Sequence, residues 1–77
     1  MEFHIRIRSF REMQDFVALA TAQPFAVRLG NEHQCVNATS FMGVASMDHR
    51  RPIRVSAECE ESLFHSFRQK AARFFAE

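Results

Sequence analysis

The residues best suited to chemistry in this chain are its histidines. Imidazole titrates near neutral pH, so it can transfer protons, bind a metal or accept a phosphoryl group. The four histidines stand at positions 4, 33, 49 and 65. Their spacing, relative to one another and to the two cysteines, matches no zinc-binding pattern. We therefore expect no metal and no other cofactor, and we expect all four histidines to be solvated surface side chains.

Two serines precede apolar segments, which is the usual position of a helix N-cap. Ser9 opens the S-x-x-E sequence Ser9-Phe10-Arg11-Glu12, which is typical of a capping box. Its hydroxyl is expected to accept from the third helical amide, while the Glu12 side chain reaches back. Ser40 precedes the apolar residues 41–47, where a glycine limits the expected helix to about two turns.

The cysteines and the charge balance narrow the class of protein. Cys35 and Cys59 have no CxxC partner, so we expect small buried or half-buried thiols in a reducing cytoplasm. The chain of 77 residues carries ten basic and nine acidic side chains, a balance that argues against nucleic acid as the main partner. The residues at its start do not form an unbroken apolar stretch and no apolar run reaches 18 residues, so we expect neither a signal peptide nor a transmembrane helix. A single cytoplasmic domain, residues 1–77, is expected.

Periodicity predicts the elements that position these side chains. Period-two alternation predicts strands near residues 3–8, 25–29, 32–38 and 53–57. Apolar residues at helical spacing predict helices from Phe10 to about Ala22, after Ser40, and from about Glu60 into the C-terminal region. Gly30-Asn31 is a turn signal between the second and third strands.

These elements predict an α+β fold in the order βαββαβα. Each strand has one apolar face and each helix one apolar stripe. We therefore expect an open-faced β-sandwich, in which three helices cover one face of a four-stranded antiparallel sheet and water covers the other. The apolar stripes, expected to face the core, contain the residues Phe10, Met13, Phe16, Val17, Ala20, Leu63, Phe64, Phe67, Ala71, Phe74 and Phe75.

The element order and one segment resemble the histidine-containing phosphocarrier protein HPr of the bacterial sugar phosphotransferase system. The segment is Thr39-Ser40-Phe41-Met42-Gly43-Val44-Ala45-Ser46-Met47, and Gram-positive HPr proteins carry the similar Ser-Ile-Met-Gly-Val-Met-Ser-Leu-Gly. Val55-Ser56-Ala57-Glu58 and Asp15-Phe16-Val17 also fit. The resemblance extends over nearly the whole chain.

The chain departs from the family where the family's active histidine lies. That histidine belongs to a Gly-Leu-His-x-Arg-Pro-Ala motif, which is absent here. Alignment back from Phe16 puts Ser9 at the position of the histidine, Arg11 at that of the arginine and Glu12 at that of the proline. Because a serine phosphate ester does not release phosphate as readily as a phosphoimidazole, we expect no phosphotransfer at Ser9 and no enzymatic activity.

The resemblance also implies a regulatory role for Ser40. The matching serine of Gram-positive relatives is phosphorylated by an ATP-dependent HPr serine kinase, and the product recruits a transcriptional corepressor partner. A phosphate on Ser40 would lie at a helix N-terminus, where backbone amides favour an anion. This interpretation is compatible with a capping role for the same hydroxyl.

The family's docking surface corresponds to the surroundings of Ser40. The resemblance assigns Phe41, Met42 and Met47 to that surface and places Arg11 at its flank, where it could pair with a carboxylate or a phosphate. The alternative for the apolar side chains is the core, and for Arg11 it is plain exposure to water.

Three functions remain open at this point. The first is a regulatory HPr-like protein that binds phosphotransferase or catabolite-control proteins and does not transfer phosphate. The second is a working phosphocarrier that uses an atypical acceptor among the four histidines. The third is a small nucleic-acid-binding module that uses the basic side chains expected on the open sheet face, namely His4, Arg6, Arg8, Arg28 and Arg54.

Overall fold

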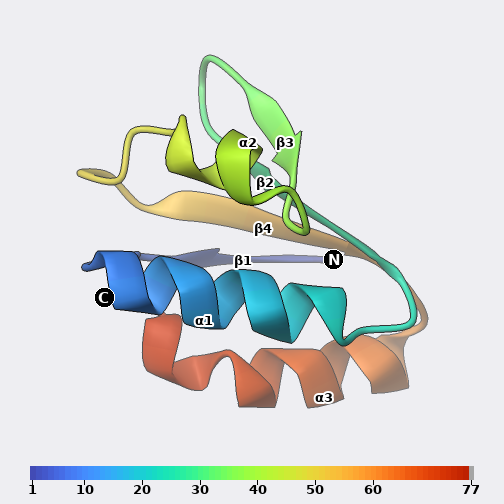
Figure 1. Cartoon of the computed structure of the whole chain (residues 1–77). Helices are drawn as coiled ribbons and strands as arrows, with labels where there is room; N and C mark the ends of the chain where they lie inside the picture. The colour runs from blue at the N-terminus through green and yellow to red at the C-terminus, as the bar shows by residue number, and fades with distance from the viewer. Residues whose placement is uncertain (77) are drawn as a thin grey trace.

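The structure, a computed structural model, describes residues 1–76. The elements follow the predicted order, with a short 3-10 helix added at the end (Figure 1). They are β1 (Glu2–Ile5), α1 (Phe10–Thr21), β2 (Ala26–Gly30), β3 (Cys35–Asn37), α2 (Phe41–Ala45), β4 (Ile53–Glu58), α3 (Glu61–Lys70) and η1 (Ala72–Phe74).

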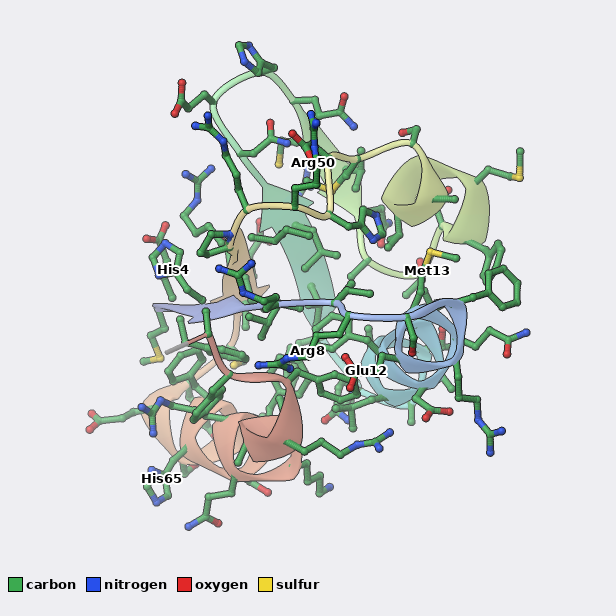
Figure 2. The ribbon with its side chains drawn as sticks, turned by 90° about the vertical axis from the view of Figure 1, so that its left-hand side faces the viewer. His4, Arg8, Glu12, Met13, Arg50 and His65 are labelled. Carbon is green, nitrogen blue, oxygen red and sulfur yellow. The ribbon has the colours of Figure 1, made fainter. Side chains whose placement is uncertain are left out.

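The four strands form one antiparallel sheet in the order β1-β4-β2-β3. The three helices cover one face, which confirms the predicted α+β open-faced sandwich. α1 and α3 lie side by side and α2 lies near the start of α1 (Figures 1 and 2). The side chains on the other face of the sheet point toward solvent.

Phenylalanine rings fill the layer between the sheet and the helices. Phe16 of α1 is fully buried, and its ring centroid lies 5.3 Å from that of Phe74 and 6.4 Å from that of Phe67. The strands bury alternate residues, as in the burial of Val27 and Leu29 in β2. A small chain gains most of its stability from such a core, because its buried surface is limited.

β3 is shorter than the predicted strand at residues 32–38. The Asn31 carboxamide oxygen accepts hydrogen bonds from the amides of His33 and Gln34, at 2.8 and 2.9 Å. This side-chain turn takes residues 31–34 out of the strand and into a loop. The predicted hairpin between β2 and β3 is confirmed, but no residue in the described range has a positive φ.

The C-terminal region also differs from the single apolar stripe predicted for it. α3 ends at Lys70 and η1 follows it, so that the Phe74 ring packs against the Phe16 ring. Leu63, which was expected to face the core, is 40% exposed. Residues 74–76, here called the C-terminal strap, then bond to the outer edge of β1. The Arg6 amide donates to the Phe74 carbonyl at 2.7 Å, and the Ala76 amide donates to the His4 carbonyl at 3.2 Å.

The helices are short relative to a lipid bilayer. None of those in residues 1–76 is long and apolar enough to span a membrane.

Candidate functional site

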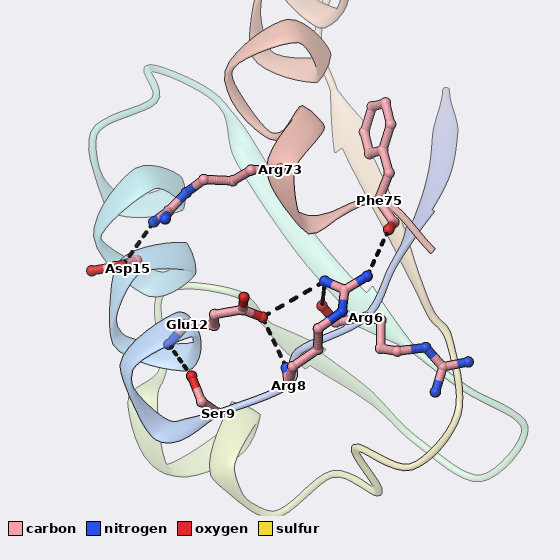
Figure 3. A network of polar contacts seen from close by, with 7 residues as sticks. All are labelled: Arg6, Arg8, Ser9, Glu12, Asp15, Arg73 and Phe75. Atoms are coloured by element: carbon pink, nitrogen blue, oxygen red, sulfur yellow. Dashed lines mark hydrogen bonds and ion pairs between the residues drawn. The ribbon is translucent and has the colours of Figure 1, made fainter. Parts of the chain in front are cut away.

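The N-terminus of α1 is occupied by the protein's own polar groups. Ser9 has an extended backbone, and its Oγ accepts from the Glu12 amide at 3.1 Å (Figure 3). The Glu12 carboxylate reaches back and accepts from the Arg8 amide at 2.9 Å. The predicted cap is therefore present, with the return bond going to Arg8 instead of Ser9. The Ser9 hydroxyl and the Glu12 carboxylate already accept hydrogen bonds from backbone amides that could otherwise bind an anion.

Arg8 points toward the C-terminal strap and away from the open face of the sheet. Its Nη1 lies 3.8 Å from the Glu12 Oε1, and its Nη2 donates to the Phe75 carbonyl at 3.2 Å (Figure 3). The prediction that Arg8 belongs to a basic patch on the open face is therefore wrong. β1 ends at Ile5, so Arg8 lies beyond the strand that was predicted at residues 3–8, and its side chain follows the strap instead.

Arg11 is the most exposed charged group at the start of α1. Its side chain is 83% exposed, and its Nε lies 3.6 Å from the Asp15 Oδ1. The other oxygen of Asp15 accepts from the Arg73 Nη2 at 2.8 Å, which ties α1 to η1. This hydrogen bond from Arg73 is the main reason that the pKa of Asp15 lies below its usual value. Since Arg73 already serves Asp15, Arg11 can leave that carboxylate at little cost.

Ser40 caps α2 in the same way that Ser9 caps α1. Its Oγ accepts from the Gly43 amide at 3.2 Å, and the residue is exposed. A Cβ atom at Gly43 would lie 3.2 Å from the Ser40 Oγ and 3.3 Å from the Val36 Cβ. The glycine that was expected to weaken the helix therefore allows α2 to pack closely against β3. The helix spans five residues, less than the two turns expected.

Three apolar side chains at the starts of α1 and α2 form what we call the Phe10–Phe41–Met42 surface. The Phe10 and Phe41 rings meet edge to face, with centroids 5.7 Å apart. Phe10 is 63% exposed and Met42 is 79% exposed, while Phe41 is half-buried. Exposed apolar side chains gathered at one place on a small domain are typical of an interaction surface.

Two expectations about these side chains are corrected by the structure. Phe10 was expected to face the core, but the first turn of α1 places it outside, against Phe41. Met47 was expected on the docking surface, but it is 5% exposed and belongs to the core. Both residues lie at a helix end, where helical spacing does not determine which way a side chain points.

The histidines lie on different elements, and none stands in the first turn of a helix. His4 is on β1, His33 is in the β2–β3 loop, and His65 is within α3, all exposed. His49 is half-buried, and its Nε2 lies 2.7 Å from the Val44 carbonyl oxygen. Because a carbonyl only accepts, this ring nitrogen carries the proton. The prediction of a solvated surface side chain is therefore wrong for His49, which bonds to a carbonyl of α2.

The open face of the sheet is less basic than its arginines suggest. Arg28 lies 3.7 Å from a carboxylate oxygen of Glu58, and Arg54 lies 3.7 Å from one of Glu2. Phe3 is buried and Phe25 is half-buried, so neither offers a free ring for stacking bases. These features weigh against binding of nucleic acid on this face.

The cysteines are both free, and Cys35 is exposed where a buried or half-buried thiol was expected. Cys35 faces away from the core because it lies on the solvent side of β3. Within residues 1–76, no three His, Cys, Asp or Glu side chains come together as a metal site requires.

Comparison with known proteins supports the fold. No protein-family model matches the sequence, and no curated protein does. The chain is similar to a solved structure described as the crystal structure of HPr-C-His from Thermoanaerobacter tengcongensis. The two share 23% sequence identity, with a TM-score of 0.73 over 100% of this chain and 97% of the other. The chain therefore has an HPr-like fold, as its sequence predicted.

Proposed function

We propose that this chain is a regulatory HPr-like protein of the bacterial cytoplasm. It binds proteins of the sugar phosphotransferase or catabolite-control network through the Phe10–Phe41–Met42 surface, and phosphorylation of Ser40 regulates that binding. It is not an enzyme and does not carry phosphate on a histidine. The observation that carries the proposal is a difference between two capped helix starts. The Glu12 carboxylate lies in the first turn of α1 beside Ser9. The first turn of α2 beside the exposed Ser40 has no acidic residue, and it presents Met42, which is 79% exposed.

The chemistry of the α1 start disfavours phosphotransfer. A phosphocarrier must give up its phosphoryl group readily, which a phosphoimidazole does because imidazole is a neutral leaving group. Ser9 offers an alkoxide as the leaving group instead. The Glu12 carboxylate, one helical turn away, also repels an arriving phosphate.

The surroundings of Ser40 suit a modified serine. Ser40 is exposed, and no acidic residue lies in the first turn of α2. Phe41 and Met42 follow it directly in the chain. A phosphate added there changes the charge at the border of the apolar surface, which makes binding to a partner sensitive to phosphorylation.

Arg11 gives this surface a charged border on the α1 side. Its weak contact with Asp15, at 3.6 Å, leaves the guanidinium free to pair with a carboxylate of a partner. The apolar centre and the charged rim together are typical of protein–protein interfaces.

Two incubations followed by intact-mass spectrometry test the phosphorylation chemistry. One uses phosphoenolpyruvate with the general phosphotransferase enzyme, and the other uses ATP with an HPr serine kinase. We expect one acid-stable phosphate from ATP, lost in Ser40→Ala and retained in Ser46→Ala, a matched exposed serine of the same segment. An acid-labile phosphate from phosphoenolpyruvate would instead indicate a working phosphocarrier that uses one of the histidines.

A titration with the general phosphotransferase enzyme, followed by amide NMR signals, tests the surface. Signals of residues 9–11 and 40–43 should shift, and Phe10→Ala and Met42→Ala should weaken binding. Ala18→Ser, an exposed position farther along α1, is the matched control and should leave binding unchanged. Shifts confined to other faces would contradict the proposed surface.

A further inference from the structure

A hollow with a volume of about 770 Å³ lies at one end of the open sheet face. The β2–β3 loop and the α2–β4 loop form its walls, and residues of β1, β2 and β4 contribute to its floor. Figure 2 views the molecule from this side, with His4 and Arg50 labelled. The hollow shares no residue with the Phe10–Phe41–Met42 surface.

Arg54 provides a guanidinium held in place on the floor of this hollow. In the sheet, it pairs with His4 of β1 on one side and Gly30 of β2 on the other. A Cβ atom at position 30 would lie 2.6 Å from the Arg54 Nη2 and 3.3 Å from its Cζ. Gly30 has no positive φ, so what the glycine supplies is space: the guanidinium lies across its backbone.

The walls are held in shape by bonds within the protein. The Asn31 side chain accepts from the His33 and Gln34 amides, which fixes the β2–β3 loop. The Arg6 Nη1 donates to the Arg50 carbonyl at 3.1 Å, which anchors the α2–β4 loop to the end of β1. A ligand that enters this hollow pays little for ordering the loops, since they are already ordered.

The charges around the hollow favour an anion. Arg50 is committed to Asp48, with two hydrogen bonds of 3.0 and 3.2 Å. Arg51 lies 4.0 Å from Glu32 and both side chains are about 80% exposed, so this pair is weak and easily exchanged. The Arg54 Nε lies 3.7 Å from the Glu2 Oε2, and no hydrogen bond within residues 1–76 uses the terminal nitrogens of the Arg54 side chain, so these can bind a ligand. His4 and His33 also line the hollow.

We propose that this hollow binds a small phosphorylated compound, with Arg54 on the floor and Arg51 at the rim as its phosphate ligands. The planar guanidinium fork matches two oxygens of a phosphate. No phenylalanine lines the hollow, and the carboxylates of Glu2 and Glu58 stand beside the path that a long phosphate backbone would take along the open face. A compact ligand therefore suits the hollow better than a nucleic acid.

The proposal is tested by titrating the full chain with inorganic pyrophosphate at constant ionic strength and following the amide NMR signals. Saturable shifts are expected at residues 30–34 and 50–54. Arg54→Gln should weaken binding by about tenfold or more, because it removes charge-assisted hydrogen bonds. Arg28→Gln, which removes an ion-paired arginine of the same face outside the hollow, should change binding by less than about twofold.

Gly30→Ala separates geometry from charge. The added methyl meets only the far end of the Arg54 side chain, so the protein should fold while the guanidinium is displaced from the floor. Binding should weaken with the net charge unchanged. If Gly30→Ala disrupts the fold, the comparison of pyrophosphate binding by Arg54→Gln and Arg28→Gln tests the proposal by itself.

Three results would overturn the proposal. The first is the absence of saturable shifts with pyrophosphate. The second is an equal loss of binding in Arg54→Gln and Arg28→Gln, which would indicate only diffuse attraction. The third is tighter binding of a single-stranded RNA, with shifts extending across β2 and β3, which would indicate a nucleic-acid surface instead.

Discussion

Phe10 and Phe41 touch across the gap between two helices, with their ring planes at 74° and their centroids 5.7 Å apart. Each ring belongs to the first residue of its helix and directly follows the serine that caps it. The contact therefore holds together the two helix starts. It also keeps Phe10 exposed, because the ring rests on Phe41 instead of entering the core.

Truncating two phenylalanines of α1 should have very different effects. Phe16→Ala should lower the free energy of unfolding by about 3–5 kcal/mol, because it opens a cavity in the fully buried core. Phe10→Ala should cost only about 1 kcal/mol, the worth of one aromatic pair. Urea denaturation followed by circular dichroism measures both. An equal loss in the two variants would show that Phe10 contributes to the core.

Loss of either serine cap should destabilise the fold. Ser9→Ala and Ser40→Ala each remove the acceptor of a helical amide and should cost about 0.5–2 kcal/mol. Ser66→Ala, at an exposed position within α3, is the control and should stay within about 0.5 kcal/mol of the parent protein. Thermal denaturation ranks the three variants. A Ser40→Ala protein as stable as the control would mean that its cap bond contributes nothing.

Removing the hydrogen bond from Arg8 to the C-terminal strap should weaken the backbone hydrogen bonds between the strap and β1. Arg8→Gln removes the charged donor to the Phe75 carbonyl. Exchange of the Arg6 and Ala76 amides, which bond across this edge, should become about tenfold faster, since one charged hydrogen bond is lost. Amides between β2 and β4 should exchange as before. Arg11→Gln is the matched control, and similar exchange in both variants would contradict the role given to Arg8.

Acid should remove the contribution of Asp15. Its pKa in the folded protein lies below the ordinary value of 3.8, mainly through the hydrogen bond from Arg73. A depressed pKa means that the contact stabilises the fold above about pH 4. The stabilisation is lost as the pH falls through the folded-state value.

Two arginine variants identify the partner that matters to Asp15. Arg73→Gln should lower stability at pH 7 more than Arg11→Gln, because Arg73 bonds at 2.8 Å and Arg11 lies at 3.6 Å. The difference between Arg73→Gln and the parent protein should shrink below pH 4. Denaturation midpoints measured from pH 2 to pH 7 check this, and a constant difference across that range would assign the effect to packing of Arg73 on Phe74.

The sequence predicted those buried residues whose positions follow from regular strand or helix periodicity. Alternation placed Val27, Leu29 and Val55 in the core, and helical spacing did so for Met13 and Phe16. It failed at element ends, where the neighbours in space come from elsewhere in the chain. Phe10, Met47 and His49 all lie at or beyond a helix terminus, and their surroundings are fixed by α1, α2 and the loops between them.

The candidate site was predicted in part for the same reason. The capping serines could be recognised because caps depend on a few adjacent residues. The turn of Arg8 toward Phe75 could not, because these residues are 67 positions apart and the strap has no local signal. The contact of the Arg54 guanidinium with the Gly30 backbone could not be predicted either, because it depends on the register of β2 and β4.

The pairing of Phe75 with Ile5 also sets the timing of folding during synthesis. β1 precedes both of its neighbours in the chain, because the inner neighbour β4 and the outer strap both come from the second half of the sequence. Non-local pairings of this kind form late, because a long loop must close first. The apolar side chains of β1, Phe3 and Ile5, therefore stay without a neighbouring strand until β4 has been synthesised.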